Sequence, residues 1–119
     1  MKKISTEKAP AAIGPYSQAV IAGDFLYASG QIPINPATGN VEAEGITAQA
    51  EQSMINVGEI LKAAGATYDN VVKTTCFLAE IADFAAFNEV YAKYFTQNPA
   101  RSCVAVKDLP KGVLCEVEV

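Results

Sequence analysis

The residues best suited to chemistry lie near the C-terminus, where Arg101 begins one strand-like run and Glu116 lies in the next. Arg101 is the only arginine of the chain, and its run is otherwise nearly uncharged. A guanidinium is planar and can hold a carboxylate through two parallel hydrogen bonds. Two interpretations are open from this pattern: an ion pair of Arg101 with Glu116 or Glu118, or a binding site for a small molecule that carries a carboxylate.

The residue types that are missing or scattered narrow the possible chemistry. The chain has 0 histidines, which excludes Ser-His-Asp and Cys-His catalysis and every metal site built on histidine. The cysteines, Cys76, Cys103 and Cys115, have no metal-binding spacing and are interpreted as reduced thiols. The glycines stand singly, so no phosphate-binding loop is present. We therefore expect no metal and no cofactor.

Composition limits the fold and the partners. The chain has 119 residues, of which 50% are hydrophobic and 18% are charged, and we expect one folded domain over residues 1–119. The net charge of −4 argues against a nucleic-acid partner, which needs a basic face. No apolar run is long enough to span a bilayer, and residues 1–7 lack the apolar core of a signal peptide. We expect a cytoplasmic protein without a membrane partner.

Periodicity predicts the elements that must position Arg101 and Glu116. After a largely irregular segment 1–16, residues 17–22 and 25–29 alternate like strands around a Gly-Asp turn. Apolar residues at helical spacing predict helices over 45–64 and 84–96, and we assign the aromatic stripe of the second to the core. The nearly uncharged run 71–78 reads as a central strand buried on both faces.

Two further strand-like runs lie on either side of the breaker 108–112. The predicted order is β-β-α-β-α-β-β, an α+β fold with both helices free to pack on one face of a single mixed sheet. The short connection between the last two runs suggests that they pair as a hairpin.

Several motifs, in the same order, make the chain resemble the RidA/YjgF family of enamine and imine deaminases over essentially its whole length. They are AAIGPYSQ (11–18), SGQIP (29–33), VVKTT (71–75), FNEVY (87–91), PARS (99–102), and LPKG (109–112) with EVE (116–118). The resemblance implies a chorismate-mutase-like fold and a homotrimer with ligand clefts between subunits. It also implies that the last strand lies between the first core strand and the strand at 71–78, which contradicts the hairpin.

The resemblance assigns roles to residues. It implies that Arg101 holds the substrate carboxylate and that Glu116 positions the attacking water. It implies a cleft lined by six further residues: Tyr16, Ser29, Gly30, Gln31, Asn88 and Cys103. A nucleophilic role for Cys103 is disfavoured because the thiol has no partner base.

The implied reaction is hydrolysis of a 2-aminoacrylate-type enamine, through its imine, to a 2-keto acid and ammonia. One alternative is a non-catalytic or regulatory trimer that binds 2-keto acids or related metabolites in the same clefts. Another is the nuclease activity ascribed to some relatives, which the acidic charge and the absence of histidine disfavour.

Overall fold

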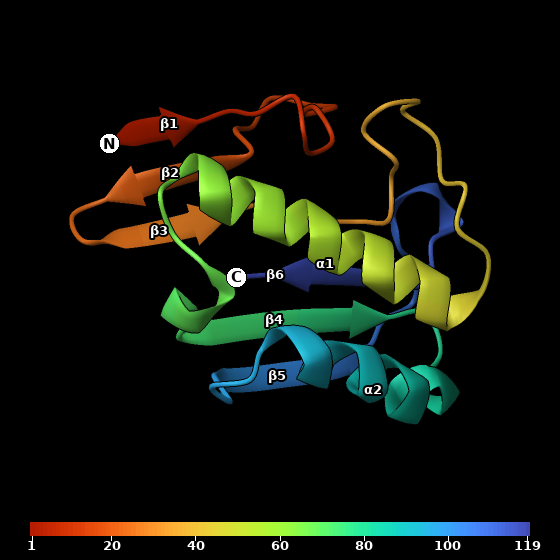
Figure 1. The fold of residues 1–119 in the computed structure, drawn as a ribbon. Helices are drawn as coiled ribbons and strands as arrows, with labels where there is room; N and C mark the ends of the chain where they lie inside the picture. The colour runs from red at the N-terminus through yellow and green to blue at the C-terminus, as the bar shows by residue number, and fades with distance from the viewer.

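The computed structural model describes residues 1–119 and contains six strands and two α-helices (Figure 1). The α+β class is confirmed, but the N-terminal segment holds a strand, β1, that periodicity did not predict. In chain order the elements are β1 (Lys2–Ile4), β2 (Ala19–Ala22), β3 (Phe25–Ala28), α1 (Gly45–Ala63), β4 (Lys73–Leu78), α2 (Phe84–Tyr94), β5 (Ala100–Ala105) and β6 (Cys115–Glu118).

The strands form two three-stranded sheets, and backbone hydrogen bonds join the two sheets edge to edge. β1, β2 and β3 pair antiparallel in that order, and β4 pairs parallel with β5 and antiparallel with β6. The Ala28 N–H donates to the Val119 carbonyl at 3.0 Å. Gln31 and Val117 exchange backbone hydrogen bonds of 2.8 and 3.1 Å. These bonds place β6 between β4 and the segment that ends β3.

The predicted hairpin of the last two strands is wrong, since β4 lies between β5 and β6. The position beside β4 that the family resemblance implies for the last strand is confirmed. In the observed order both edges of the apolar strand β4 have backbone partners, β5 on one side and β6 on the other. The connection between β5 and β6 instead crosses the end of β4, where the Ala79 N–H donates to the Leu114 carbonyl at 3.0 Å.

The two faces of the sheet differ, because side chains alternate along each strand. Both helices lie on one side of the sheet (Figure 1) and cover buried residues such as Cys76, Leu78 and Val117. We call this the helix face. The opposite face, which we call the open face, carries Phe77 and Glu116, both only partly buried. The expectation that residues 71–78 are buried on both faces is therefore wrong within one chain.

Local sequence explains where the helices begin and end. α1 ends at Ala63, one residue before the predicted end, and Gly65 follows with a φ of 80° that favours glycine. α2 ends at Tyr94, two residues early. Most of the aromatic stripe of α2 is core as predicted, because Phe87, Tyr91 and Phe95 are buried against α1 and β4.

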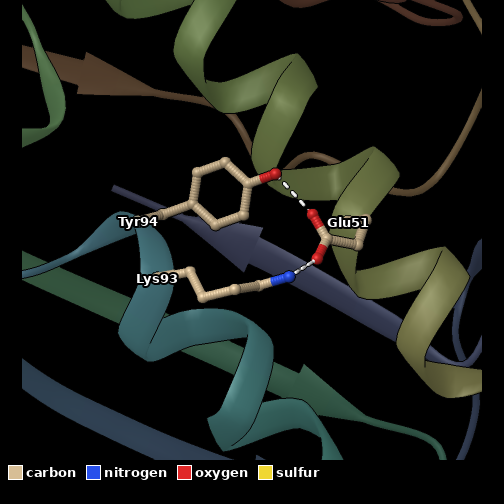
Figure 2. Close-up of polar contacts among 3 residues, drawn as sticks. All are labelled: Glu51, Lys93 and Tyr94. Atoms are coloured by element: carbon tan, nitrogen blue, oxygen red, sulfur yellow. Dashed lines mark hydrogen bonds and ion pairs between the residues drawn. The ribbon is translucent and has the colours of Figure 1, made fainter.

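A polar contact ties α1 to α2 on their outer side. The Glu51 carboxylate accepts hydrogen bonds from Lys93 Nζ and from the Tyr94 hydroxyl (Figure 2). The apolar faces of both helices pack in one core cluster with buried residues of β4 and β6. Neither helix combines the length and the apolar character that a membrane crossing requires.

Candidate active site

Arg101 lies on the helix face of the edge strand β5. Its registered partner on β4 is Thr74, a fully buried residue whose hydroxyl bonds to Tyr91 of α2. Registered partners in a sheet project to the same face, so the Arg101 side chain extends toward α2. It is partly buried there.

The Arg101 guanidinium contacts three uncharged side chains of α2. Nη1 donates a hydrogen bond of 2.6 Å to Asn88 Oδ1. The central carbon lies 4.6 Å from the ring centroid of Tyr91 and 5.4 Å from that of Phe84. These distances are typical of cation–π contacts. An aromatic and amide surface therefore holds the cation without neutralising it.

The interpretation of Arg101 as the partner of Glu116 or Glu118 is wrong within the chain. The one salt bridge in the structure joins Lys93 to Glu51. Arg101 thus keeps its positive charge available for a ligand.

Cys103 follows Arg101 by two residues and shares its face of β5. Its thiol is half-buried, and burial raises its pKa although the Arg101 charge opposes the rise. A raised pKa keeps the thiol protonated near neutral pH, which does not suit a nucleophile. Together Asn88, Arg101 and Cys103 form what we call the arginine group.

Glu116 lies on the open face, beside Gly30. A Cβ at Gly30 would overlap the Glu116 carboxylate, so only glycine leaves room for this packing. Burial raises the pKa of Glu116, and the neighbouring Glu118 charge raises it further. A carboxylate with a raised pKa is a stronger proton acceptor than an ordinary glutamate once it is ionised.

Two of the remaining predicted residues, Tyr16 and Ser29, differ in the hydrogen bonds that they can still offer to a ligand. Tyr16 and Ser29 line an open cavity of about 660 Å³ that also includes Glu118. The Tyr16 hydroxyl accepts from the Ile13 N–H at 3.2 Å, which leaves its own proton free. The Ser29 hydroxyl already donates to the Ser17 carbonyl at 2.7 Å.

Gln31 does not point to the open face. It pairs with the core residue Val117 and is buried on the helix face. Its amide nitrogen donates to the Ser29 and Gly30 carbonyls at 3.2 and 3.4 Å, and its Oε1 has no partner. We call Tyr16, Ser29, Gly30 and Glu116 the glutamate group. Gln31 is not part of this group, but its side chain donates hydrogen bonds to the backbone carbonyls of Ser29 and Gly30.

The two groups cannot act on one ligand within a single chain. Arg101 is registered with Thr74 and Glu116 with Phe77, so three positions, about 10 Å, separate them along β4. They also project from opposite faces of the sheet. A ligand held by Arg101 can meet Glu116 only where two chains lie against each other.

Residues 6–119 match the protein-family model described as Endoribonuclease L-PSP. The chain belongs to the RidA/YjgF family. The human 2-iminobutanoate/2-iminopropanoate deaminase is 53% identical over 116 residues, which are 97% of this chain and 85% of the human protein. AldR of Lactococcus lactis subsp. lactis, named as a candidate regulator, is 54% identical over 120 residues, covering 100% of this chain and 95% of AldR.

Solved structures of the RidA/YjgF family have the same fold. The YjgF gene product of E. coli superposes with a TM-score of 0.93 at 50% identity, over 99% of this chain and 95% of that chain. E. coli TdcF with bound serine gives a TM-score of 0.94 at 44% identity, also over 99% and 95%.

Sequence reasoning missed the surroundings of Arg101 in this RidA/YjgF chain. Phe84 and Tyr91 were assigned to the core, and Thr74 had no role. The available signal was spacing: residues 84, 88 and 91 lie on one helix face, the i, i+4, i+7 pattern. Which strand that face would meet could not be derived from the pattern.

Proposed function

We propose that this RidA/YjgF chain hydrolyses 2-imino acids, formed from 2-aminoacrylate-type enamines, to 2-keto acids. Each turnover consumes one water and releases one ammonia. The observation that carries the proposal is Arg101, a partly exposed cation that three uncharged side chains orient and no carboxylate neutralises. The deaminase names of relatives more than 50% identical support the same reaction.

Arg101 would act by orientation. In a 2-imino acid the carboxylate and the electrophilic carbon are bonded to each other, so fixing one places the other. Orienting a reacting carbon toward its attacker contributes up to about 7 kcal/mol or more in ideal intramolecular reactions. No strong acid is needed when the iminium carbon is already electrophilic.

Glu116 would act as the general base. Its ionised carboxylate accepts a proton from water as the oxygen adds to the imine carbon. Glu116 then returns this proton to the amino group of the carbinolamine, and the C–N bond breaks to release ammonia as the hydroxyl group loses its proton and becomes the keto carbonyl. General-base assistance typically contributes about 10²–10⁴-fold. The burial that raises the Glu116 pKa favours this role.

The proposal includes a homotrimer whose sites lie between subunits. The arginine and glutamate groups project from opposite faces of one sheet, so a complete site needs two chains. The open face also exposes large apolar side chains, with Tyr27 60% and Val104 46% exposed. Such a surface favours association.

The test is Arg101→Ala, assayed with imines generated from amino acids by an L-amino-acid oxidase. We expect a loss of at least about 100-fold in kcat/KM with fold and oligomeric state retained. Arg101→Lys, which keeps the charge but not the planar fork, should recover little. Lys107→Ala, the loss of an exposed cation, is the control. A wild-type rate from Arg101→Ala would exclude the carboxylate clamp.

A second candidate is a regulatory protein that binds 2-keto acids without turnover, favoured by the similarity to AldR. Both functions need Arg101 to bind the carboxylate, but only the enzymatic function needs Glu116 as a base. If the protein is an enzyme, Glu116→Gln should retain 2-keto-acid binding and lose turnover. If wild-type protein binds a 2-keto acid but releases no ammonia from any of a panel of imines, the regulatory function holds.

A further inference from the structure

The surroundings of Arg101 indicate a device that fixes its orientation before a ligand binds. Tyr91 covers one face of the guanidinium, with its ring centroid 4.6 Å from the central carbon. Asn88 Oδ1 accepts one hydrogen bond from the guanidinium, of 2.6 Å, from Nη1. A guanidinium has five N–H donors, so this arrangement still leaves enough for a two-bond grip on a carboxylate.

Tyr91 is itself held by a hydrogen bond to Thr74 of β4. Its hydroxyl lies 2.8 Å from Thr74 Oγ1, and the two residues are 9% and 0% exposed. Thr74 is also the registered neighbour of Arg101 in the parallel β4–β5 ladder. The contacts therefore close a ring through three elements: Arg101 on β5, Tyr91 on α2 and Thr74 on β4.

We propose that Tyr91 and Thr74 are positioning residues that hold the Arg101 guanidinium in its ligand-binding orientation. The proposal rests on the function proposed above. A free arginine side chain samples many rotamers, and restricting them before binding removes a cost that the ligand would otherwise bear. Burial raises the pKa of Tyr91, so its phenol stays neutral and does not compete with the substrate for the cation.

The experiment measures the Kd for 2-oxobutanoate and the KM and kcat for its imine in three variants. Tyr91→Leu removes the ring, Tyr91→Phe keeps the ring without its anchor, and Thr74→Val removes the anchor alone. We expect Kd and KM to rise about tenfold for the first and about threefold for the other two, with smaller changes in kcat. Tyr68→Phe, which removes a tyrosine hydroxyl that donates to the Met54 carbonyl of α1, is the matched control and should leave all three constants unchanged.

Coupling to Arg101 separates positioning from general damage to the fold. In an Arg101→Ala background, Tyr91→Leu and Thr74→Val should weaken 2-oxobutanoate binding no further, whereas additive losses would overturn the proposal. If Tyr91→Leu does not fold, Thr74→Val decides, and an unchanged Kd in it overturns the inference. If Arg101→Ala itself binds and turns over like wild type, the proposed function fails instead.

Discussion

At Gly30, the absence of a side chain leaves the space that the carboxylate of Glu116, the proposed base, occupies. The Glu116 carboxylate occupies the space that a Cβ at residue 30 would take. Gly30 therefore does more than allow a ligand to approach, because it also fixes where Glu116 lies. The Gly30 carbonyl in turn accepts a hydrogen bond of 3.4 Å from the Gln31 side-chain amide.

Gly30→Ala should displace the Glu116 carboxylate and lower kcat by about tenfold or more, with the fold retained. Steady-state imine hydrolysis measures the loss. The control is a double-mutant cycle: on a Glu116→Ala background, where the carboxylate is absent, Gly30→Ala should cost nothing further. Equal losses in both backgrounds would mean that Gly30 acts on the ligand rather than on Glu116.

The ionisation of Glu116 should be visible in the pH profile. Its pKa is raised above the usual 4.5, first by burial and then by Glu118, so the ionised base is lost as the pH falls through a value above 4.5. Glu118→Gln removes the like charge and should move the acid limb of kcat/KM to lower pH. Profiles from about pH 4 to about pH 8 measure it. Glu89→Gln, an exposed carboxylate on α2, should not move the limb; an upward move in Glu118→Gln would contradict the assignment.

Among the elements, α2 has the greatest influence on the arginine group, since it supplies the three side chains that contact the Arg101 guanidinium. Its position over β4 and β5 depends partly on α1, through the contacts of Glu51 with Lys93 and Tyr94. Both hydrogen bonds lower the pKa of Glu51, the larger effect coming from Lys93.

Glu51→Gln should lower the free energy of unfolding by about 1 kcal/mol at neutral pH. The expected loss is modest because the Glu51 side chain is 28% exposed and water screens the charge. Since its folded pKa lies below 4.5, the contribution is complete above pH 4.5 and is lost as the pH falls through the lower folded value. Urea unfolding at fixed protein concentration measures it. Glu89→Gln is the matched control, and an equal loss there would contradict the contact.

The elements also show what the sequence could predict. Helical and strand periodicity located both helices and the strands from β2 to β6, because each has an apolar side to bury. It missed β1, since Lys2 and Lys3 give that strand no alternating apolar pattern and only its pairing with β2 defines it. It paired β5 with β6 because a short connection resembles a hairpin, whereas the order of strands depends on contacts distant in sequence.

The candidate site was predictable as a set of residue types but not as a geometry. The family motifs predicted that Arg101 and Glu116 belong to the same site. Periodicity gives the alternation along each strand, but it does not give the side of the sheet on which the helices pack. That side determines that Arg101 faces α2 while Glu116 faces away from it.

For the whole molecule, the placement of Arg101 and Glu116 on opposite faces of the sheet favours a site formed by two chains. One chain presents the arginine group on its helix face and the glutamate group on its open face. A closed ring of identical subunits repeats the same contact between each pair of neighbours. If that contact brings the arginine group of one chain to the glutamate group of the next, every site is complete, and no chain is active alone.

Mixing two inactive variants tests this arrangement. In trimers assembled at random from equal amounts of Arg101→Ala and Glu116→Gln chains, a site is intact when its arginine comes from the second variant and its glutamate from the first. The chance is one half for each, so about one quarter of the wild-type activity should return. Co-refolding followed by native mass spectrometry verifies the mixed trimers, and a mixture of Arg101→Ala with Arg101→Lys is the control without recovery. Mixed trimers with no activity would mean that each site draws both residues from one chain, which would require the two faces of the sheet to be reached by a single ligand.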